Sequence, residues 1–403
     1  MSFKDIIGQQ EAKEHLAGMV QQNRLSHALL FLGKEGNGAL PLAIAFAQYV
    51  VCERVNGKKE TAAAGPSLFG EEPVTSNQPP PLADACGICA SCQKAQQLVH
   101  PDIHFSYPVI PRKAGDKPVS TDYITEWREF ITETPYGNAY DWLQFIGAEN
   151  KQGNITAYEC NEIIRKLNLK SFESGFKILI LWMPEYLGNE GNKLLKLIEE
   201  PPADTLFILV AENESQILAT ILSRTQLVKI PALTTEAITE ALITKAQCTP
   251  EQARPVAFIA AGNYREALQL IRHAEEDWQS HLRDWLNAIL KNGPIAQVKW
   301  IDEISKLGRE KQKQFLLYFN HLLEQAIRLQ AMGTDKVYLP DNERDFALRL
   351  NKIAGFEQQE AIIEELDRAA YYIERNANAK MLFHALTIKL YHIIAHKQVA
   401  RLM

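Results

Sequence analysis

The sequence has 403 residues, of which 46% are hydrophobic and 23% are charged, and its formal net charge at pH 7 is -6. A chain of this length exceeds a single compact core, so we expect a globular protein of two or three domains. The acidic balance excludes a protein whose whole surface binds nucleic acid, because such binding needs Lys and Arg to neutralise phosphates, but it leaves a local basic face open.

The first fifty or so residues predict a helix, a buried strand and a second helix. Apolar residues recur at helical spacing over residues 9–23, and ALLFLG at 28–33 is a short apolar run that ends in glycine. A further helix is predicted from Leu40 to Val51. The opening MSFKDIIGQQ lacks the basic flank and apolar core of a signal peptide, and no segment is apolar enough to span a membrane. We therefore expect a cytoplasmic protein without membrane contacts.

The same alternation of helices and strands returns after residue 155. Strands are predicted at 177–182, 205–210 and 225–230, and helices at 156–169, 192–200 and 215–222. Strands that alternate with helices indicate a parallel sheet that is covered on both faces. The fold class predicted for residues 1–230 is therefore α/β.

Two stretches interrupt this pattern. Residues 56–83 are rich in Pro, Gly, Ala and Ser, which is typical of a flexible surface insertion. Residues 104–154 are too aromatic for a linker, so we expect an ordered insertion, whose role the sequence leaves open. Its aromatic residues include Trp127, Tyr136, Tyr140, Trp142 and Phe145.

The strand patterns stop after Pro231. Short helical patterns between residues 235 and 275 predict a small helical domain, and longer ones follow from 276 onward. In the long segments apolar residues recur at the spacing that a packed helical bundle requires. We therefore expect three domains, at 1–230, 231–275 and 276–403.

A glycine-rich loop follows the first predicted strand. A phosphate-binding loop has the pattern G-x-x-x-x-G-K-[ST], in which backbone N–H groups hold phosphates, the Lys reaches the terminal ones and the hydroxyl holds Mg²⁺. Gly33 and Gly38 have the required spacing, with Gly36 between them, but Ala39 stands at the lysine position and Leu40 at the hydroxyl position. The pattern indicates a phosphate loop that has lost its chemistry, and an ordinary tight turn is the alternative interpretation.

Two other features argue against ATP hydrolysis. Lys34 lies too near the start of the loop to replace the missing lysine. The strand at 177–182 should end in acidic residues that hold Mg²⁺, yet it ends in Trp182, Met183 and Pro184. Glu185 comes later, and we expect it to point away. Two separate parts of the hydrolytic machinery are therefore missing.

Two arginines are candidate phosphate-contacting residues. Arg224, in TILSRTQ at 220–226, precedes a predicted strand. It is either an ordinary ion-paired arginine or an arginine finger, which stabilises the charge that develops on a neighbouring subunit's ATP during phosphoryl transfer. Arg265, in GNYREAL, lies where a lid helix would touch phosphate, although a structural role is the more cautious interpretation.

Three cysteines form the pattern C-x-x-C-x-x-C at Cys86, Cys89 and Cys92. This spacing brings thiolates onto one tetrahedral ion, and Cys52 is the predicted fourth ligand, ahead of His100. Four cysteines fill every position on the metal, so the pattern predicts a structural zinc module over residues 52–92. Buried or redox-active thiols without metal are the alternative.

Several segments together resemble the clamp-loader family of AAA+ proteins, which includes the delta-prime and gamma or tau subunits of bacterial DNA polymerase III. The segments are IIGQQEAKEHL, SHALLFLG before the glycine loop, Cys52 with CGICASC, HPD, NKLLKLIEEPPADTLFIL and ATILSRTQ. The resemblance covers roughly residues 1–102 and 155–275. The segment NKLLKLIEEPP and the triplet SRT, where the family usually has Ser-Arg-Cys, are its most specific parts.

Within that family, gamma or tau subunits keep the loop lysine and the acidic strand end, whereas delta-prime subunits commonly lack both and retain the arginine. The departures at the glycine loop and at the strand end therefore make this chain similar to the delta-prime type. The resemblance implies that Arg224 faces the ATP site of an adjacent motor subunit and that the four cysteines hold Zn²⁺. It also implies that 231–275 is a lid and that 276–403 is an oligomerising collar.

The implied function is that of a subunit of the DNA polymerase III holoenzyme that helps to load the sliding clamp on primed DNA and has no ATPase activity of its own. The implied partners are the gamma or tau and delta subunits, with the clamp and primed DNA reached through the complex. Two alternatives remain: an active motor subunit of the same family, and a zinc-containing DNA-binding scaffold unrelated to loaders. Tight ATP binding and turnover would favour the first, and a monomer without affinity for motor subunits the second.

Overall fold

The computed structural model describes residues 1–56, 84–113, 115–148, 153–272, 278–333, 341–374 and 377–396. Its contacts divide the chain into two compact units, residues 1–268 and 269–403. The division into three domains with boundaries after 230 and 275 stays a prediction. Most of the insertion that we predict at 56–83 lies outside the described residues.

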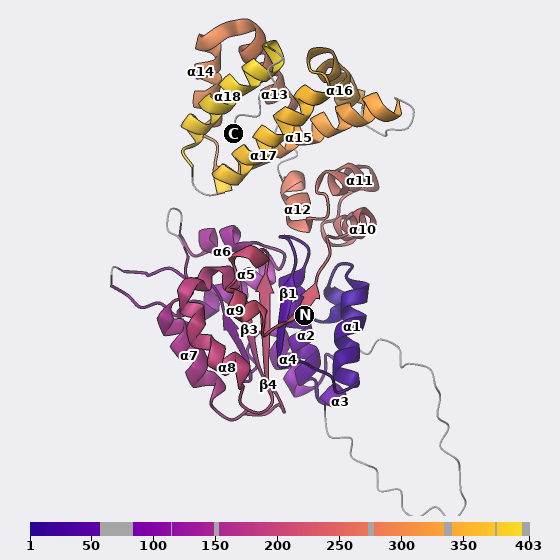
Figure 1. Ribbon diagram of the computed structural model, residues 1–403. Coiled ribbons are helices and arrows are strands. Elements are labelled where there is room, and N and C mark those ends of the chain that lie inside the picture. Colours follow the sequence, from indigo (N-terminus) through magenta and orange to yellow (C-terminus); the bar gives the residue numbers. More distant parts are fainter. Residues whose placement is uncertain are drawn as a thin grey trace, which may run out of the picture. The chain divides into compact units, whose positions relative to one another are not determined.

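A five-stranded sheet lies at the centre of the first unit (Figure 1). Its strands are β1 (Ala28–Leu32), β2 (Ile103–Ser106), β3 (Lys177–Trp182), β4 (Thr205–Ala211) and β5 (Gln226–Lys229). The spatial order is β2-β3-β4-β1-β5, and every neighbouring pair is parallel. The predicted α/β class and four of the strands are confirmed. The edge strand β2 was not predicted, because it opens the segment that we assigned to the aromatic insertion.

Helices cover both faces of the sheet, as Figure 1 shows. One face carries α1 (Gln10–Gln21), α2 (Ala39–Val51), α3 (Glu53–Asn56) and α4 (Ala90–Gln96), and the other carries α7 (Ala157–Leu167), η3 (Pro184–Leu194), α8 (Leu195–Glu199) and α9 (Ala219–Leu222). Successive strand residues point to opposite faces. Ile178 and Ile180 therefore join the core under α2, while Leu179 and Leu181 join the core under α7.

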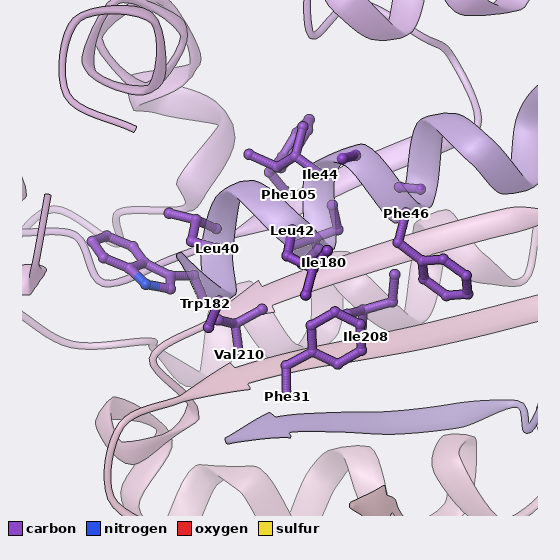
Figure 2. Close-up of a cluster of buried hydrophobic side chains, with 14 of the residues drawn as sticks. Phe31, Leu40, Leu42, Ile44, Phe46, Phe105, Ile180, Trp182, Ile208 and Val210 are labelled. Atoms are coloured by element: carbon purple, nitrogen blue, oxygen red, sulfur yellow. The ribbon is translucent and has the colours of Figure 1, made fainter. Parts of the chain in front are cut away.

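Helix α2 is the most deeply packed element of this unit, and all 13 of its residues are buried. Its sequence, ALPLAIAFAQYVV, is apolar on every side, which is the pattern of a helix enclosed by other elements. Figure 2 shows Leu42 and Phe46 of α2 directed at Ile180 and Ile208 of the sheet. This packing fixes the position of the glycine loop, because α2 begins at the residue that follows the loop.

In its described residues, 104–113, 115–148 and 153–154, the aromatic insertion forms regular structure, as predicted. It contains η2 (Ser120–Tyr123), α5 (Ile124–Glu133) and α6 (Ala139–Phe145). Trp127 and Trp142 are fully buried, and Trp127 stacks on Tyr107 with a centroid distance of 4.0 Å. The Trp142 indole Nε1–H donates to the Pro108 carbonyl oxygen at 2.7 Å. The aromatic side chains of the insertion therefore extend the hydrophobic core of the sheet unit.

A run of short helices follows β5. It consists of α10 (Thr235–Lys245), α11 (Pro250–Ile259) and α12 (Tyr264–Arg272), which agrees with the short helical patterns predicted between residues 235 and 275. Two three-residue 3₁₀ helices lie earlier in the chain, before β5: η1 (Phe3–Asp5) and η4 (Glu214–Gln216). Residues 231–268 belong to the same compact unit as the sheet.

The second unit is helical throughout its described part. Its elements are α13 (Trp278–Asn287), the π-helical turn η5 (Ala288–Asn292), α14 (Gly293–Ile304), α15 (Arg309–Met332), α16 (Asp341–Ile353), α17 (Phe356–Glu374) and α18 (Ala379–Ala395). Trp285 and Trp300 stack at 4.7 Å in its core, and the Trp285 indole donates to the Thr387 hydroxyl at 3.0 Å. Among the residues that the structure describes, no helix combines the length and apolar character that crossing a bilayer requires.

Candidate functional site

The glycine loop connects β1 to α2, as a phosphate-binding loop would. Gly36 and Gly38 have φ angles of +70° and +92°, a region that side chains other than glycine rarely adopt. A Cβ atom on Gly38 would also lie 2.9 Å from the ring of Tyr136. The loop borders a hollow of about 300 Å³, a volume that includes space open to solvent.

Polar groups of the loop are already engaged within the chain. The backbone N–H of Ala39, the first of α2, donates to Asn37 Oδ1 at 3.0 Å. Asn37 Nδ2 donates to the Ile230 carbonyl oxygen at 2.7 Å, and Gln9 Nε2 donates to the Asn37 carbonyl oxygen at 3.0 Å. The first N–H groups of a helix are those that hold phosphate in an active loop. Here one of them serves an internal hydrogen bond.

The two positions that should carry the lysine and the hydroxyl are part of the core. Ala39 is 7% exposed and Leu40 is 5% exposed, and both belong to the cluster under α2. Lys34 is exposed at the rim of the hollow. The start of α2 therefore presents apolar groups where a nucleotide would need a cation and a magnesium ligand.

The end of β3 is equally apolar. Trp182 is 2% exposed, and its ring centroid lies 5.3 Å from that of Trp127 in the aromatic insertion. Figure 2 shows Trp182 beside Leu40 at the carboxyl end of the sheet, and both line the hollow. The next residue, Met183, has a φ angle of +60° and is also buried. Aromatic packing thus occupies the position of the expected carboxylates.

Glu185 lies beyond this strand end and interacts with the segment after β4. Its Oε1 accepts the backbone N–H groups of Glu212 at 2.7 Å and Asn213 at 2.8 Å. Its Oε2 is buried without a hydrogen-bond partner in the described structure. Burial raises the pKa of this carboxyl group, because the charged form loses hydration.

This raised pKa predicts the effect of Glu185→Gln. A carboxyl group whose pKa is higher in the folded than in the unfolded chain contributes stability that is present below the unfolded pKa and is lost as the pH rises through the folded pKa. We expect the amide variant to be more stable than the parent at pH 7 by on the order of 1 kcal/mol, since a neutral group is less costly to bury unpaired. At pH 4 the gain should vanish. Urea unfolding at both values tests this, with the exposed Glu162→Gln as control, and a loss of stability at pH 7 would contradict it.

Arg265 is buried beside the glycine loop and binds two carboxylates. Its side chain is 4% exposed, and its Nε and NH2 donate to the two oxygens of Asp141 at 2.5 and 2.6 Å. Its NH1 lies 3.9 Å from Glu35 Oε1. Glu35 itself accepts hydrogen bonds from Asn138 at 2.7 Å and Asn263 at 2.9 Å. The guanidinium charge is therefore balanced inside the chain.

Arg224 lies between α9 and β5 and is partly exposed, at 34% of its side-chain surface. It forms an ion pair with Glu199, with Nε to Oε1 at 2.5 Å. Its NH1 donates to the Thr220 carbonyl oxygen at 2.8 Å and to the Ser223 hydroxyl at 3.1 Å. These bonds hold the guanidinium at the surface. The arrangement is compatible with both interpretations of Arg224 from the sequence.

The four predicted cysteines come together. The sulfur atoms of Cys52, Cys86, Cys89 and Cys92 all lie within 4.8 Å of one another, and Cys86 and Cys92 are 3.9 Å apart. Four sulfurs at about 2.3 Å from one tetrahedral zinc ion are separated by roughly 3.8 Å. The cluster therefore has the size and the donor atoms to hold such a metal. His100 is not part of it, since its Nδ1 accepts the N–H of Asp102 and its Nε2 lies 3.4 Å from Glu173.

Backbone N–H groups point at these sulfurs, as they do where thiolates are stabilised. The N–H of Cys86 donates to Cys52 Sγ at 3.3 Å, and that of Cys89 donates to Cys86 Sγ at 3.4 Å. Burial opposes ionisation of Cys86, but hydrogen bonds from the backbone of Ile88 and Cys89 outweigh it and lower the pKa of Cys86 to about 6. Metal binding needs the thiolate form. The environment favours that form at Cys86, whereas burial raises the pKa of Cys89 and of Cys92, so a bound metal would have to supply the charge that stabilises those two thiolates.

Comparison with known proteins decides the family. A family model described as DNA polymerase III, delta subunit, matches residues 8–234, more than half of the chain. The chain belongs to this family. It is also an AAA+ clamp-loader type by that membership, in agreement with the resemblance noted from its motifs.

Individual relatives in the polymerase III group are distant. The delta-prime subunit of Bacillus subtilis strain 168 is 27% identical over 260 residues, which is 64% of this chain and 58% of that protein. The tau subunit of the same organism is 24% identical over 80% of this chain and 46% of its own length. The delta-prime subunit of Escherichia coli K12 is 24% identical over 78% and 74%. The chain thus spans about half the length of the two Bacillus relatives.

Solved structures give a weaker likeness. A gamma subunit-related protein of DNA polymerase III from Thermotoga maritima aligns over 94% of this chain and 99% of its own, at 13% identity and a TM-score of 0.35.

Proposed function

We propose that this polymerase III family member is a delta-prime-type subunit of the clamp loader, with no ATPase activity of its own. In this role it contributes Arg224 to the ATP site of a neighbouring motor subunit while the sliding clamp is loaded on primed DNA. One observation carries the proposal: the positions that would hold the cation and metal of a nucleotide are buried and apolar, while the arginine of the SRT triplet remains partly exposed.

The absence of hydrolysis follows from chemistry. Phosphoryl transfer needs a lysine and Mg²⁺ to neutralise the developing charge, and the metal needs oxygen ligands. Ala39, Leu40 and Trp182 offer none of these groups, and all three side chains are buried. These facts disfavour an active motor subunit.

Arg224 is better suited to act on the ATP of a neighbouring subunit than on a nucleotide bound to its own chain. Its guanidinium lies after α9, on a different loop from the glycine loop, and its contacts with Thr220 and Ser223 keep it oriented at the surface. A planar guanidinium can give two hydrogen bonds to one phosphate, and an arginine finger is commonly offered by an adjacent subunit. In an assembly, phosphate oxygens would take the place of Glu199.

The cysteine cluster is proposed to hold one structural Zn²⁺. Zinc with four thiolates has no open position, so the metal would fix structure and would supply no catalysis. It would join the end of α2, through Cys52, to the start of α4, through Cys89 and Cys92. Proposed as well are a lid formed by 231–275 and an oligomerising collar formed by 276–403.

The proposed function predicts the behaviour of the purified chain. Alone with ATP and Mg²⁺ it should release no phosphate above the level of a buffer blank, and mixed with the delta and gamma or tau subunits of the same organism it should form a stable complex on gel filtration. ATP turnover by the isolated chain would indicate an active motor subunit. A chain that stays monomeric in the mixture would favour the zinc-containing scaffold, and either result would refute the proposal.

A further inference from the structure

The aromatic insertion contacts both the glycine loop and the start of helix α12. Tyr136 lies over Gly38, and its ring meets the ring of Tyr264 edge-on at 5.1 Å. Its hydroxyl oxygen accepts the backbone N–H of Ile7 at 2.9 Å. The tyrosine is 7% exposed, so it fills its position tightly. A side chain of the insertion therefore packs against the glycine loop and forms one wall of the hollow beside it.

The insertion also supplies the anion that Arg265 requires. A buried guanidinium beside a phosphate-type loop must be paired, and carboxylate and phosphate present the same two-oxygen edge to it. Asp141 meets Arg265 with both oxygens, and Asn138 from the same insertion donates to Glu35. The Asp141 carboxylate is held in turn, because its Oδ2 accepts the N–H of Asn138 at 3.2 Å.

Further bonds tie the glycine loop to the start of α12. The N–H of Tyr264 donates to the Gly36 carbonyl oxygen at 3.1 Å, and Asn263 Nδ2 donates to Glu35 Oε1 at 2.9 Å. A Cβ on Gly36 would lie 1.7 Å from Asn263 Oδ1, so the two segments touch. The glycine loop, the aromatic insertion and the start of α12 therefore form one cluster that is joined by hydrogen bonds and ion pairs.

We propose that residues 120–148 take the place of a bound nucleotide in this chain. Tyr136 packs against Gly38 of the glycine loop, and Asp141 gives Arg265 the paired oxygens that a phosphate would give. As a consequence, the helical segment 235–268 is held on the sheet in the absence of any ligand, and nucleotide does not change its attachment. This role of the insertion holds whether or not Arg224 serves a neighbour.

Hydrogen exchange of the full-length chain tests the proposal. Asp141→Asn keeps the size of the side chain and an oxygen for the Asn138 N–H but removes the charge that pairs with Arg265. Exchange in residues 235–268 should become about tenfold faster or more, because a buried arginine loses its partner, while β1 and β4 stay protected. Unchanged protection of 235–268 would overturn the proposal.

A matched control separates this effect from a general loss of charge. Glu162→Gln also removes a carboxylate that pairs with an arginine, Arg165, but on the exposed surface of α7, and it should leave exchange in 235–268 unchanged. If Asp141→Asn also exposes the central strands, the milder Asp141→Glu is measured instead. It must loosen 235–268 more than it loosens the strands, and equal loosening of both counts against the proposal.

A second measurement uses the unmodified chain. Adding millimolar Mg²⁺–ADP or Mg²⁺–ATP should leave the exchange of the glycine loop and of 235–268 as it is without nucleotide. Slower exchange in either segment after nucleotide is added would show that nucleotide binds beside the glycine loop. The insertion would then not take the place of a bound nucleotide.

Discussion

Arg224→Ala in a reconstituted loader is expected to lower the ATPase rate that clamp and primed DNA stimulate by on the order of a thousandfold at the site that this arginine serves. The physical reason is the loss of a positive charge that stabilises the transferring phosphoryl group. Because Arg224 is one-third exposed and pairs only at the surface with Glu199, the subunit itself should stay folded. Steady-state phosphate release by the complex measures the effect, and gel filtration shows that the complex persists.

Two control variants sharpen this experiment. Arg165→Ala removes another surface arginine that pairs with a carboxylate, Glu162, and should leave the rate unchanged. Arg224→Lys keeps the charge but not the planar fork of donors, so it should restore only part of the rate. If Arg224→Ala turns over ATP as fast as the parent complex, the arginine is an ordinary surface residue.

Removal of one cysteine of the cluster is expected to have the largest effect on stability. Cys52→Ser should abolish binding of zinc and lower the melting temperature by at least about 10 °C, since structural zinc sites contribute on the order of 10 kcal/mol to the folding of small metal-binding domains. Cys52 ends α2, the most buried helix, so the loss should spread into the sheet unit. Metal analysis and thermal unfolding measure the two effects.

The comparison for this variant is Cys248→Ser, which changes a half-buried cysteine outside the cluster. It should keep its metal and most of its stability. A strong chelator should reproduce the effect of Cys52→Ser on the parent protein. A parent protein purified without zinc and insensitive to chelator would indicate that the cluster is a group of free thiols.

The sequence predicted those parts of the fold whose signal is local. The runs KILILW and TLFILV are continuously apolar because both faces of a parallel strand are buried, and they became β3 and β4. The strand β2, IHFS, is short and includes a histidine and a serine, so it gave no such run. The helix predicted at 215–222 is shorter in the structure, where only Ala219–Leu222 is α-helical.

The candidate site likewise has parts that local sequence patterns predict and parts that they do not. The cysteine pattern has a fixed spacing, and the structure brings its three cysteines together with Cys52. The pairing of Asp141 with Arg265 joins residues 124 positions apart, and no periodicity or motif marks either partner as belonging to the other. Tyr136 was predicted to be ordered, but its position over Gly38 depends on how the whole insertion packs.

The packing of Trp182 against Trp127 has a consequence for any attempt to build a metal site at the end of β3. A substitution that put an acidic residue at position 182 would bury a charge among aromatic rings and destabilise the unit before any metal could bind. A working metal site there would therefore require changes in the aromatic insertion as well as at the strand end.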